Sequence, residues 1–129
     1  MLLAITAALL FVSACGGREG QTGSSESGAS CRRGSGRIEV SAIGISFDRD
    51  CLAGPAGRPF RIAFTNRDAG IPHNLAIYSN PSASEILCRG DRFRGLNTTI
   101  CRVPALAAGT LFFRCDTHPS QMTGTFIVG

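Results

Sequence analysis

The chain has 129 residues, which is enough for one domain besides terminal segments. Its 13 basic residues are all arginine and outnumber the 9 acidic residues, so the formal net charge is +4. Single arginines such as Arg49, Arg58, Arg61 and Arg67 are spread along the chain, with no basic run interleaved with aromatics, and we therefore expect no nucleic-acid binding.

The first residues predict export. Residues 2–12 are apolar except for Thr6, which is about the length of a signal-peptide hydrophobic region and too short to span a bilayer. Val12-Ser-Ala-Cys15 resembles a bacterial lipobox, and this resemblance implies that Cys15 is lipidated and becomes the mature N-terminus. We predict a signal peptide of lipoprotein type over residues 1–14. The alternative is an ordinary cleaved signal with an incidental cysteine.

A tether is predicted between the signal peptide and the folded part. Residues 15–36 are rich in glycine and serine, a composition that suits a flexible linker and cannot bury a core. The single folded domain is predicted at residues 37–129. The protein is thus expected to be exported and lipid-anchored to the extracytoplasmic face of a bacterial membrane.

Within the domain, alternating apolar and polar residues predict short strands. They are expected at residues 37–43, 59–65, 71–78, 86–88, 98–103, 110–115 and 123–128, with residues 44–47 continuing the first strand after a bulge. Residues 48–58 contain two glycines and a proline and are predicted to be a loop, and residues 79–85 a short helical turn. This spacing of strands, without helical periodicity, favours an all-β sandwich.

Four cysteines of an exported domain can form disulfides: Cys31, Cys51, Cys88 and Cys101. Three connectivities are open to them. We prefer Cys31 with Cys51 and Cys88 with Cys101, because each pair closes a short loop.

The last loop carries a set of metal donors. With Cys15 assigned to lipid, Cys115 is left unpaired, and a metal bond to its thiolate would explain an odd cysteine in a secreted protein. His118 and Met122 follow on the same loop, and the only other histidine of the chain is His73. Cysteine, two histidines and a weak axial methionine form the donor set of a blue-copper electron-transfer site.

These segments together carry a family resemblance: Gly70-Ile-Pro-His-Asn74, Cys115-Asp-Thr-His118 and Met122. Over residues 37–129 the chain resembles the cupredoxins, the Greek-key β-sandwich family of blue-copper proteins. The resemblance implies that His73, Cys115, His118 and Met122 hold one copper ion. It also implies that Asn74 ties the two ligand loops together, as the equivalent asparagine does in plastocyanins.

The spacing of the last loop, C-x2-H-x3-M, is one residue longer between histidine and methionine than in amicyanins and one shorter than in plastocyanins. Gln121 is therefore kept as an alternative axial ligand to Met122.

The resemblance implies a monomeric one-electron carrier that forms transient complexes with redox partners. In the family, His118 would present its edge to the partner, and Pro119 and Ile71 are candidates for the apolar docking patch. The alternative function is an extracytoplasmic copper-handling lipoprotein that scavenges or delivers the metal. We expect no enzyme, because both histidines are already used and no second copper centre or nucleophile–base pair remains.

Overall fold

The structure is a computed structural model that describes residue 31 and residues 37–129. The signal peptide predicted at residues 1–14, the lipid on Cys15 and nearly all of the tether predicted at residues 15–36 lie outside the described residues and stay predictions. No helix in the described part is long and apolar enough to cross a bilayer.

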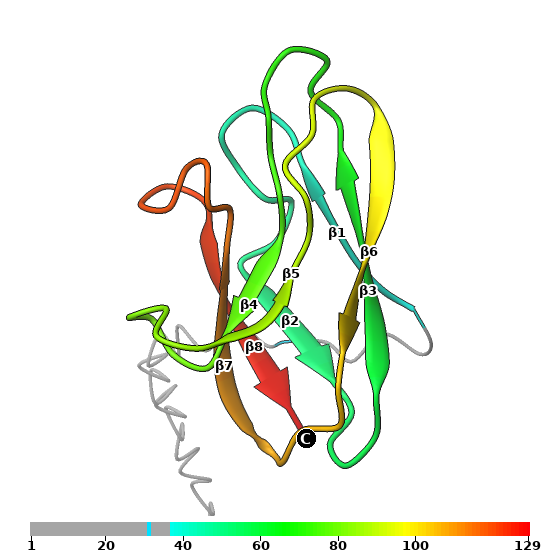
Figure 1. Ribbon diagram of the computed structural model, residues 1–129, viewed down its shortest axis with the longest axis vertical. Helices are drawn as coiled ribbons and strands as arrows, with labels where there is room; N and C mark the ends of the chain where they lie inside the picture. Colours follow the sequence, from blue (N-terminus) through cyan, green and yellow to red (C-terminus); the bar gives the residue numbers. More distant parts are fainter. Residues whose placement is uncertain (1–30, 32–36) are drawn as a thin grey trace, which may run out of the picture.

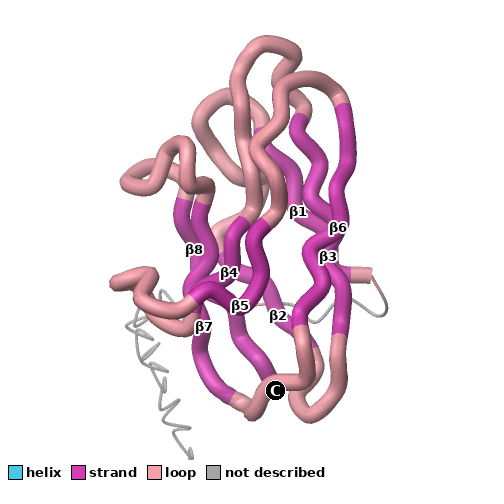
Figure 2. Tube along the Cα trace, in the orientation of Figure 1, coloured by secondary structure: helices cyan, strands magenta, loops and turns pink. Residues whose placement is uncertain are grey.

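Eight strands form two facing sheets (Figure 1). In chain order they are β1 (Ile38–Ala42), β2 (Cys51–Gly54), β3 (Phe60–Asn66), β4 (Ala76–Tyr78), β5 (Ile86–Arg89), β6 (Asn97–Val103), β7 (Gly109–Arg114) and β8 (Thr123–Val128). One sheet has the order β1-β3-β6 and the other β2-β8-β7-β4-β5. The described residues contain strands and loops only (Figure 2). The chain passes repeatedly from one sheet to the other, and the predicted Greek-key β-sandwich is confirmed.

The core fills the space between the sheets with the inward side chains of both. Ile62 and Phe64 of β3 are 0 % and 1 % exposed, and Phe113 of β7 and Phe126 of β8 have no exposed area. Removing apolar surface from water stabilises the fold by about 25 cal/mol per Å². The alternation that predicted these strands is thus the alternation that buries one face of each.

Two disulfides brace this small core. Cys88 on β5 bonds to Cys101 on β6, which joins the edges of the two sheets, and Cys31 bonds to Cys51 at the start of β2. This is the preferred connectivity. Cross-links over such loops stabilise by about 3 kcal/mol each in the chain-entropy account. Cys115 is the free cysteine of the described residues, and it is buried.

The prediction of a loop over residues 48–58 is wrong for its middle residues. Residues 51–54 form β2, which pairs in parallel with β8. Leu52 and Ala53 are both buried, so this strand lacks the alternation that marks strands such as β6 and β8. Gly54 belongs in it because the ring of Phe126 packs against its backbone, where an added Cβ would lie 2.9 Å from Cζ.

Two further local predictions are wrong. Residues 43–46 form a turn instead of continuing β1, closed by a bond from the Ile43 N–H to the Ser46 carbonyl (3.1 Å), with Gly44 at a φ of 61°. Residues 79–85 form a turn and no helix, because the Asn80 side chain accepts the Ser82 N–H at 3.0 Å and so competes with helical bonding.

Candidate metal centre

The predicted ligands meet at one end of the sandwich. His73 lies before β4, and Cys115, His118 and Met122 lie in the loop between β7 and β8 (Figure 1). One donor atom from each of His73, Cys115 and His118 falls within 4.8 Å of the other two. Among the described residues this is the one group of three or more such side chains placed to share a metal ion.

The β7–β8 loop is folded tightly on its own backbone. The Cys115 N–H donates to the Met122 carbonyl at 2.9 Å, which closes the loop just beyond the two strands. The N–H groups of His118 and Met122 donate to the carbonyls of Cys115 (3.1 Å) and His118 (3.0 Å), so the ligand positions are bonded to one another. Met122 is 1 % exposed whereas Gln121 is exposed, which favours methionine as the axial donor.

His73 is held by a neighbouring loop. The strand predicted from residue 71 begins only at Ala76, but His73 exchanges two backbone hydrogen bonds of 3.1 Å with Phe93. Pro72 restricts the backbone directly before it. His73 and Cys115 have no exposed area, so both are shielded from water.

The donor geometry fits a metal ion. Cys115 Sγ lies 3.8 Å from Nδ1 of His73 and 3.8 Å from Nδ1 of His118. A first-row metal that binds a thiolate at about 2.3 Å and an imidazole nitrogen at about 2.0 Å keeps these donors about 3.5–3.8 Å apart. Sulfur and imidazole donors together favour copper, because soft sulfur suits Cu(I) and imidazole also suits Cu(II).

The far side of the His73 ring is bonded to a carboxylate. Nε2 of His73 lies 2.9 Å from Oδ2 of Asp68, so Nε2–H donates a hydrogen bond to Asp68. The lone pair of Nδ1 is then left to bind a metal ion. Asp68 Oδ1 accepts the Gly44 N–H at 3.1 Å. The bond from Gly44 is the largest effect on the pKa of Asp68 and lowers it, and the contact with His73 lowers it further. Together they hold this pKa below its ordinary value of 3.8, although burial acts in the opposite direction.

A buried asparagine organises the loop that carries Asp68. Asn66 has no exposed area and donates to the carbonyls of Ile71 (3.0 Å) and Phe93 (2.8 Å), while its Oδ1 accepts the Asp68 N–H at 2.9 Å. These bonds satisfy the amide fully and fix the approach to His73.

Asn74 joins the two ligand segments. Its Oδ1 accepts the Asp116 N–H at 2.7 Å, directly after Cys115, and its Nδ2 donates to the Gly90 carbonyl (3.2 Å) and to Asp116 Oδ2 (3.3 Å). These contacts can tie the two ligand loops together, which is the role predicted for Asn74.

Asp116 is also the centre of a polar cluster beside the site. It accepts hydrogen bonds from Tyr78 (2.6 Å) and Arg114 (2.9 Å) and forms an ion pair with Arg89 (3.0 Å). Burial alone would raise the pKa of Asp116 and is the largest effect, but the bonds from Tyr78, Arg114 and Asn74 together outweigh it and lower the pKa.

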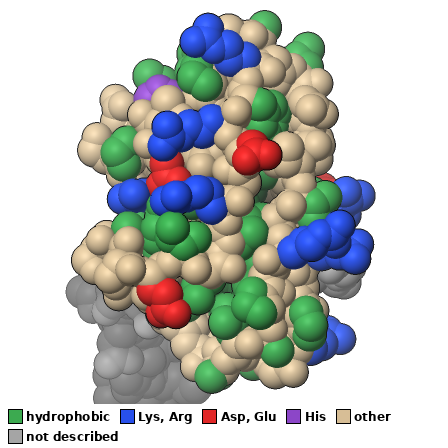
Figure 3. Space-filling model, viewed as in Figure 1, with side chains coloured by type: hydrophobic (Ala, Val, Ile, Leu, Met, Phe, Trp, Pro, Cys, Tyr) green, Lys and Arg blue, Asp and Glu red, His purple; other side chains and the backbone are tan. Residues whose placement is uncertain are grey.

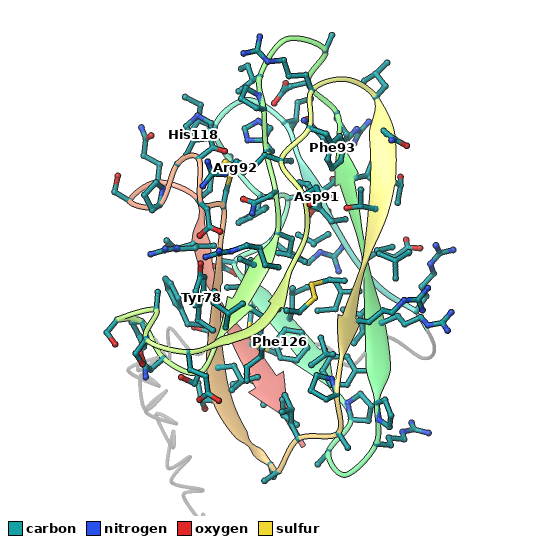
Figure 4. All side chains as sticks on the ribbon, viewed as in Figure 1. Tyr78, Asp91, Arg92, Phe93, His118 and Phe126 are labelled. Atoms are coloured by element: carbon teal, nitrogen blue, oxygen red, sulfur yellow. A yellow bond between two sulfur atoms is a disulfide. The ribbon has the colours of Figure 1, made fainter. Side chains whose placement is uncertain are left out.

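One ligand reaches the surface. His118 is half-buried, and the imidazole visible at the upper left of Figure 3 belongs to it, because His73 has no exposed area. Figure 4 places His118 at the same end of the molecule as Arg92 and Phe93.

Sequence reasoning did not single out Asp68, Asn66 or the Asp116 cluster. The partners of Asp116 come from β4, β5 and β7, so no local motif connects them. The available signals were a polar residue five positions before His73 and an aspartate next to Cys115.

No protein-family model matches the sequence, and no curated protein matches it. Solved structures do match. An auracyanin from the photosynthetic bacterium Roseiflexus castenholzii aligns with a TM-score of 0.68 and 18 % identity over 75 % of this chain and 99 % of that chain. Auracyanin A, a "blue" copper protein from Chloroflexus aurantiacus, aligns with a TM-score of 0.63 and 24 % identity over 72 % of this chain and 98 % of that one.

An azurin from Methylomonas sp. strain J aligns with a TM-score of 0.61 and 16 % identity over 78 % of this chain and 99 % of that chain. Auracyanins and azurins are cupredoxins, so this chain has the cupredoxin fold. Within that fold, His73, Cys115, His118 and Met122 stand in the arrangement of a mononuclear copper site.

Proposed function

We propose that this protein is a mononuclear blue-copper electron carrier, with His73, Cys115, His118 and Met122 as ligands. The observation that carries the proposal is the buried thiol of Cys115, equidistant at 3.8 Å from Nδ1 of two histidines. A bound copper ion would supply a one-electron couple. The protein side chains hold the ligand geometry and exclude water around His73, Cys115 and Met122.

His118 is the ligand through which a partner would exchange electrons, because its ring reaches the surface. Apolar side chains lie on loops at the same end: Ile43 is 55 % exposed, Ile45 44 % and Leu96 79 %. Their loops are bonded to Asp68, through the Gly44 N–H to its carboxylate and the Gly95 N–H to its carbonyl (3.0 Å). A small apolar patch suits a transient redox complex.

Pro119 and Ile71, predicted from the sequence for this patch, extend it: Pro119 is exposed and Ile71 half-buried. We propose that the partners are redox proteins, that the chain acts as a monomer, and that it is not an enzyme. The one potential metal-holding group of the described residues already uses both histidines. Export is supported by the two disulfides, which persist in oxidising compartments.

Electron transfer and copper handling can be separated by two measurements on the copper-loaded protein. A carrier is expected to give a reversible one-electron couple by voltammetry and rapid electron self-exchange, and to keep its copper when mixed with a Cu(I) chelator of moderate affinity. Loss of Cu(I) to the chelator within the mixing time, with slow self-exchange, would instead support the copper-handling alternative.

A matched pair of variants tests the docking patch. Leu96→Ser removes an exposed apolar side chain near the site, and Ile86→Ser removes one that is 47 % exposed on β5. We expect Leu96→Ser to slow electron self-exchange and Ile86→Ser to leave it unchanged. Equal rates in the two variants would refute the patch.

A further inference from the structure

A row of arginines crosses the outer face of the three-stranded sheet. Arg61 of β3 is the direct antiparallel partner of Arg102 of β6. Ile38 pairs with Ile62 in the parallel β1–β3 ladder, so the preceding residues, Arg37 and Arg61, lie side by side. All three side chains are exposed, and Arg58 lines the same surface depression as Arg37 and Arg61.

These charges are poorly compensated within the described part of the protein. Glu39 forms an exposed ion pair with Arg37 (3.3 Å), while no ion pair involves Arg58, Arg61 or Arg102 there. Among the charged side chains of this surface, these four arginines stand against one glutamate. Like charges directly opposite in an antiparallel pair are destabilising, so an external anionic surface would relieve a repulsion that the fold retains.

This face is remote from the metal centre. Arg61 precedes Asn66 by five residues along β3, which is roughly 17 Å in a strand. Arginine atoms gather at the right of Figure 3, over β3 and β6, whereas the exposed imidazole of His118 lies at the upper left. A surface bound to the arginine row therefore leaves His118 free for a redox partner.

We propose that the arginine row, Arg37, Arg58, Arg61 and Arg102, docks the domain on the anionic phospholipid headgroups of the membrane that the predicted lipid on Cys15 would enter. The predicted tether, residues 15–36, is held at Cys31 by the disulfide to Cys51 and then leads to Arg37. A basic patch is a common second signal beside a lipid anchor. Each arginine near an anionic surface strengthens binding about fivefold, an effect that salt weakens.

The test uses the full-length protein, as the cell processes it, on vesicles of phosphatidylcholine with or without phosphatidylglycerol. Arginines are labelled with phenylglyoxal and read residue by residue by mass spectrometry. With phosphatidylglycerol, labelling of Arg61 and Arg102 is expected to fall severalfold and to return at high salt. Labelling of Arg92 and Arg94, exposed at the other end of the sandwich, should not change.

Paired variants complete the test. In Arg61→Gln/Arg102→Gln the labelling of Arg58 should no longer respond to phosphatidylglycerol, whereas in Arg92→Gln/Arg94→Gln it should respond as in the wild type. Unchanged labelling of Arg61 and Arg102, or equal protection of Arg92 and Arg94, would overturn the proposal. Protection of Arg61 and Arg102 by polyglutamate but not by anionic vesicles would overturn it as well, in favour of an acidic protein partner.

Discussion

The bond between Asp68 and His73 predicts a lowered reduction potential, and Asp68→Asn tests it. The substitution keeps the shape of the side chain and one oxygen that can accept Nε2–H of His73, now 2.9 Å from Oδ2, but its amide nitrogen cannot accept the Gly44 N–H that is bonded to Oδ1. It removes the negative charge. Because a negative charge stabilises Cu(II) more than Cu(I), its removal should raise the midpoint potential.

The size of the shift follows from the geometry. Oδ2 would lie roughly 7 Å from a metal on Nδ1, across the ring, and two unit charges at that distance interact by about 2.4 kcal/mol at an effective dielectric of about 20. At about 59 mV per tenfold change, this corresponds to a rise of about 100 mV. The Asp68 side chain is 15 % exposed, and solvent will lower the shift towards about 50 mV.

Asp91→Asn is the matched control. Asp91 is exposed on a loop at the same end of the molecule (Figure 4) and loses the same charge, but no hydrogen bond connects its side chain to a ligand among the described residues. Spectroelectrochemical titration of both variants, with paramagnetic resonance spectra to show an unchanged ligand set, gives the answer. A shift for Asp68→Asn no larger than that of Asp91→Asn, or one in the opposite direction, would refute the reasoning.

Three further predictions concern stability and are measured by chemical unfolding of the metal-free protein. Asn74→Ala removes three hydrogen bonds and leaves the Asp116 N–H without its acceptor, so we expect a loss of about 3 kcal/mol. Asn97→Ala removes one exposed bond from the Thr98 N–H and should cost about 0.5–1 kcal/mol; equal losses in the two variants would contradict the role of Asn74 in joining the ligand segments. Asp116→Asn should cost about 2 kcal/mol at neutral pH. Because the folded pKa of Asp116 is lowered, this difference is present above the ordinary value of 3.8 and should vanish as the pH falls through the folded pKa; a difference independent of pH would contradict it. Gly124→Ala should cost about 1–3 kcal/mol, because a Cβ would meet the Phe113 ring and the Asp50 carbonyl (2.6 Å), whereas Gly109→Ala has open space and should be near neutral.

The fold was predictable where one face of a strand is buried and the other is solvated. β3 and β6 alternate between core residues such as Ile62 and Val103 and exposed ones such as Arg61 and Arg102, and that period is visible in the sequence. β2 was missed because Leu52 and Ala53 are both buried in a parallel pair with β8. Its stability depends on a strand more than seventy positions away, which local pattern cannot reveal.

The site divides in the same way. Its donors were predictable because thiol, imidazole and thioether side chains are scarce and fall in a short loop. The groups around them were not. Asp68 touches His73 only because Asn66 and the Gly44 turn place its carboxylate there, and both contacts depend on the folded loops.

The visible absorption and electron paramagnetic resonance spectra of the purified protein after addition of Cu(II), beside a Cys115→Ser variant, test the central claim most directly. We expect an intense blue band and narrow copper hyperfine splitting, both lost in the variant, because the thiolate of Cys115 is the donor that produces them. A colourless protein, or spectra that do not change when Cys115 is replaced, would contradict it.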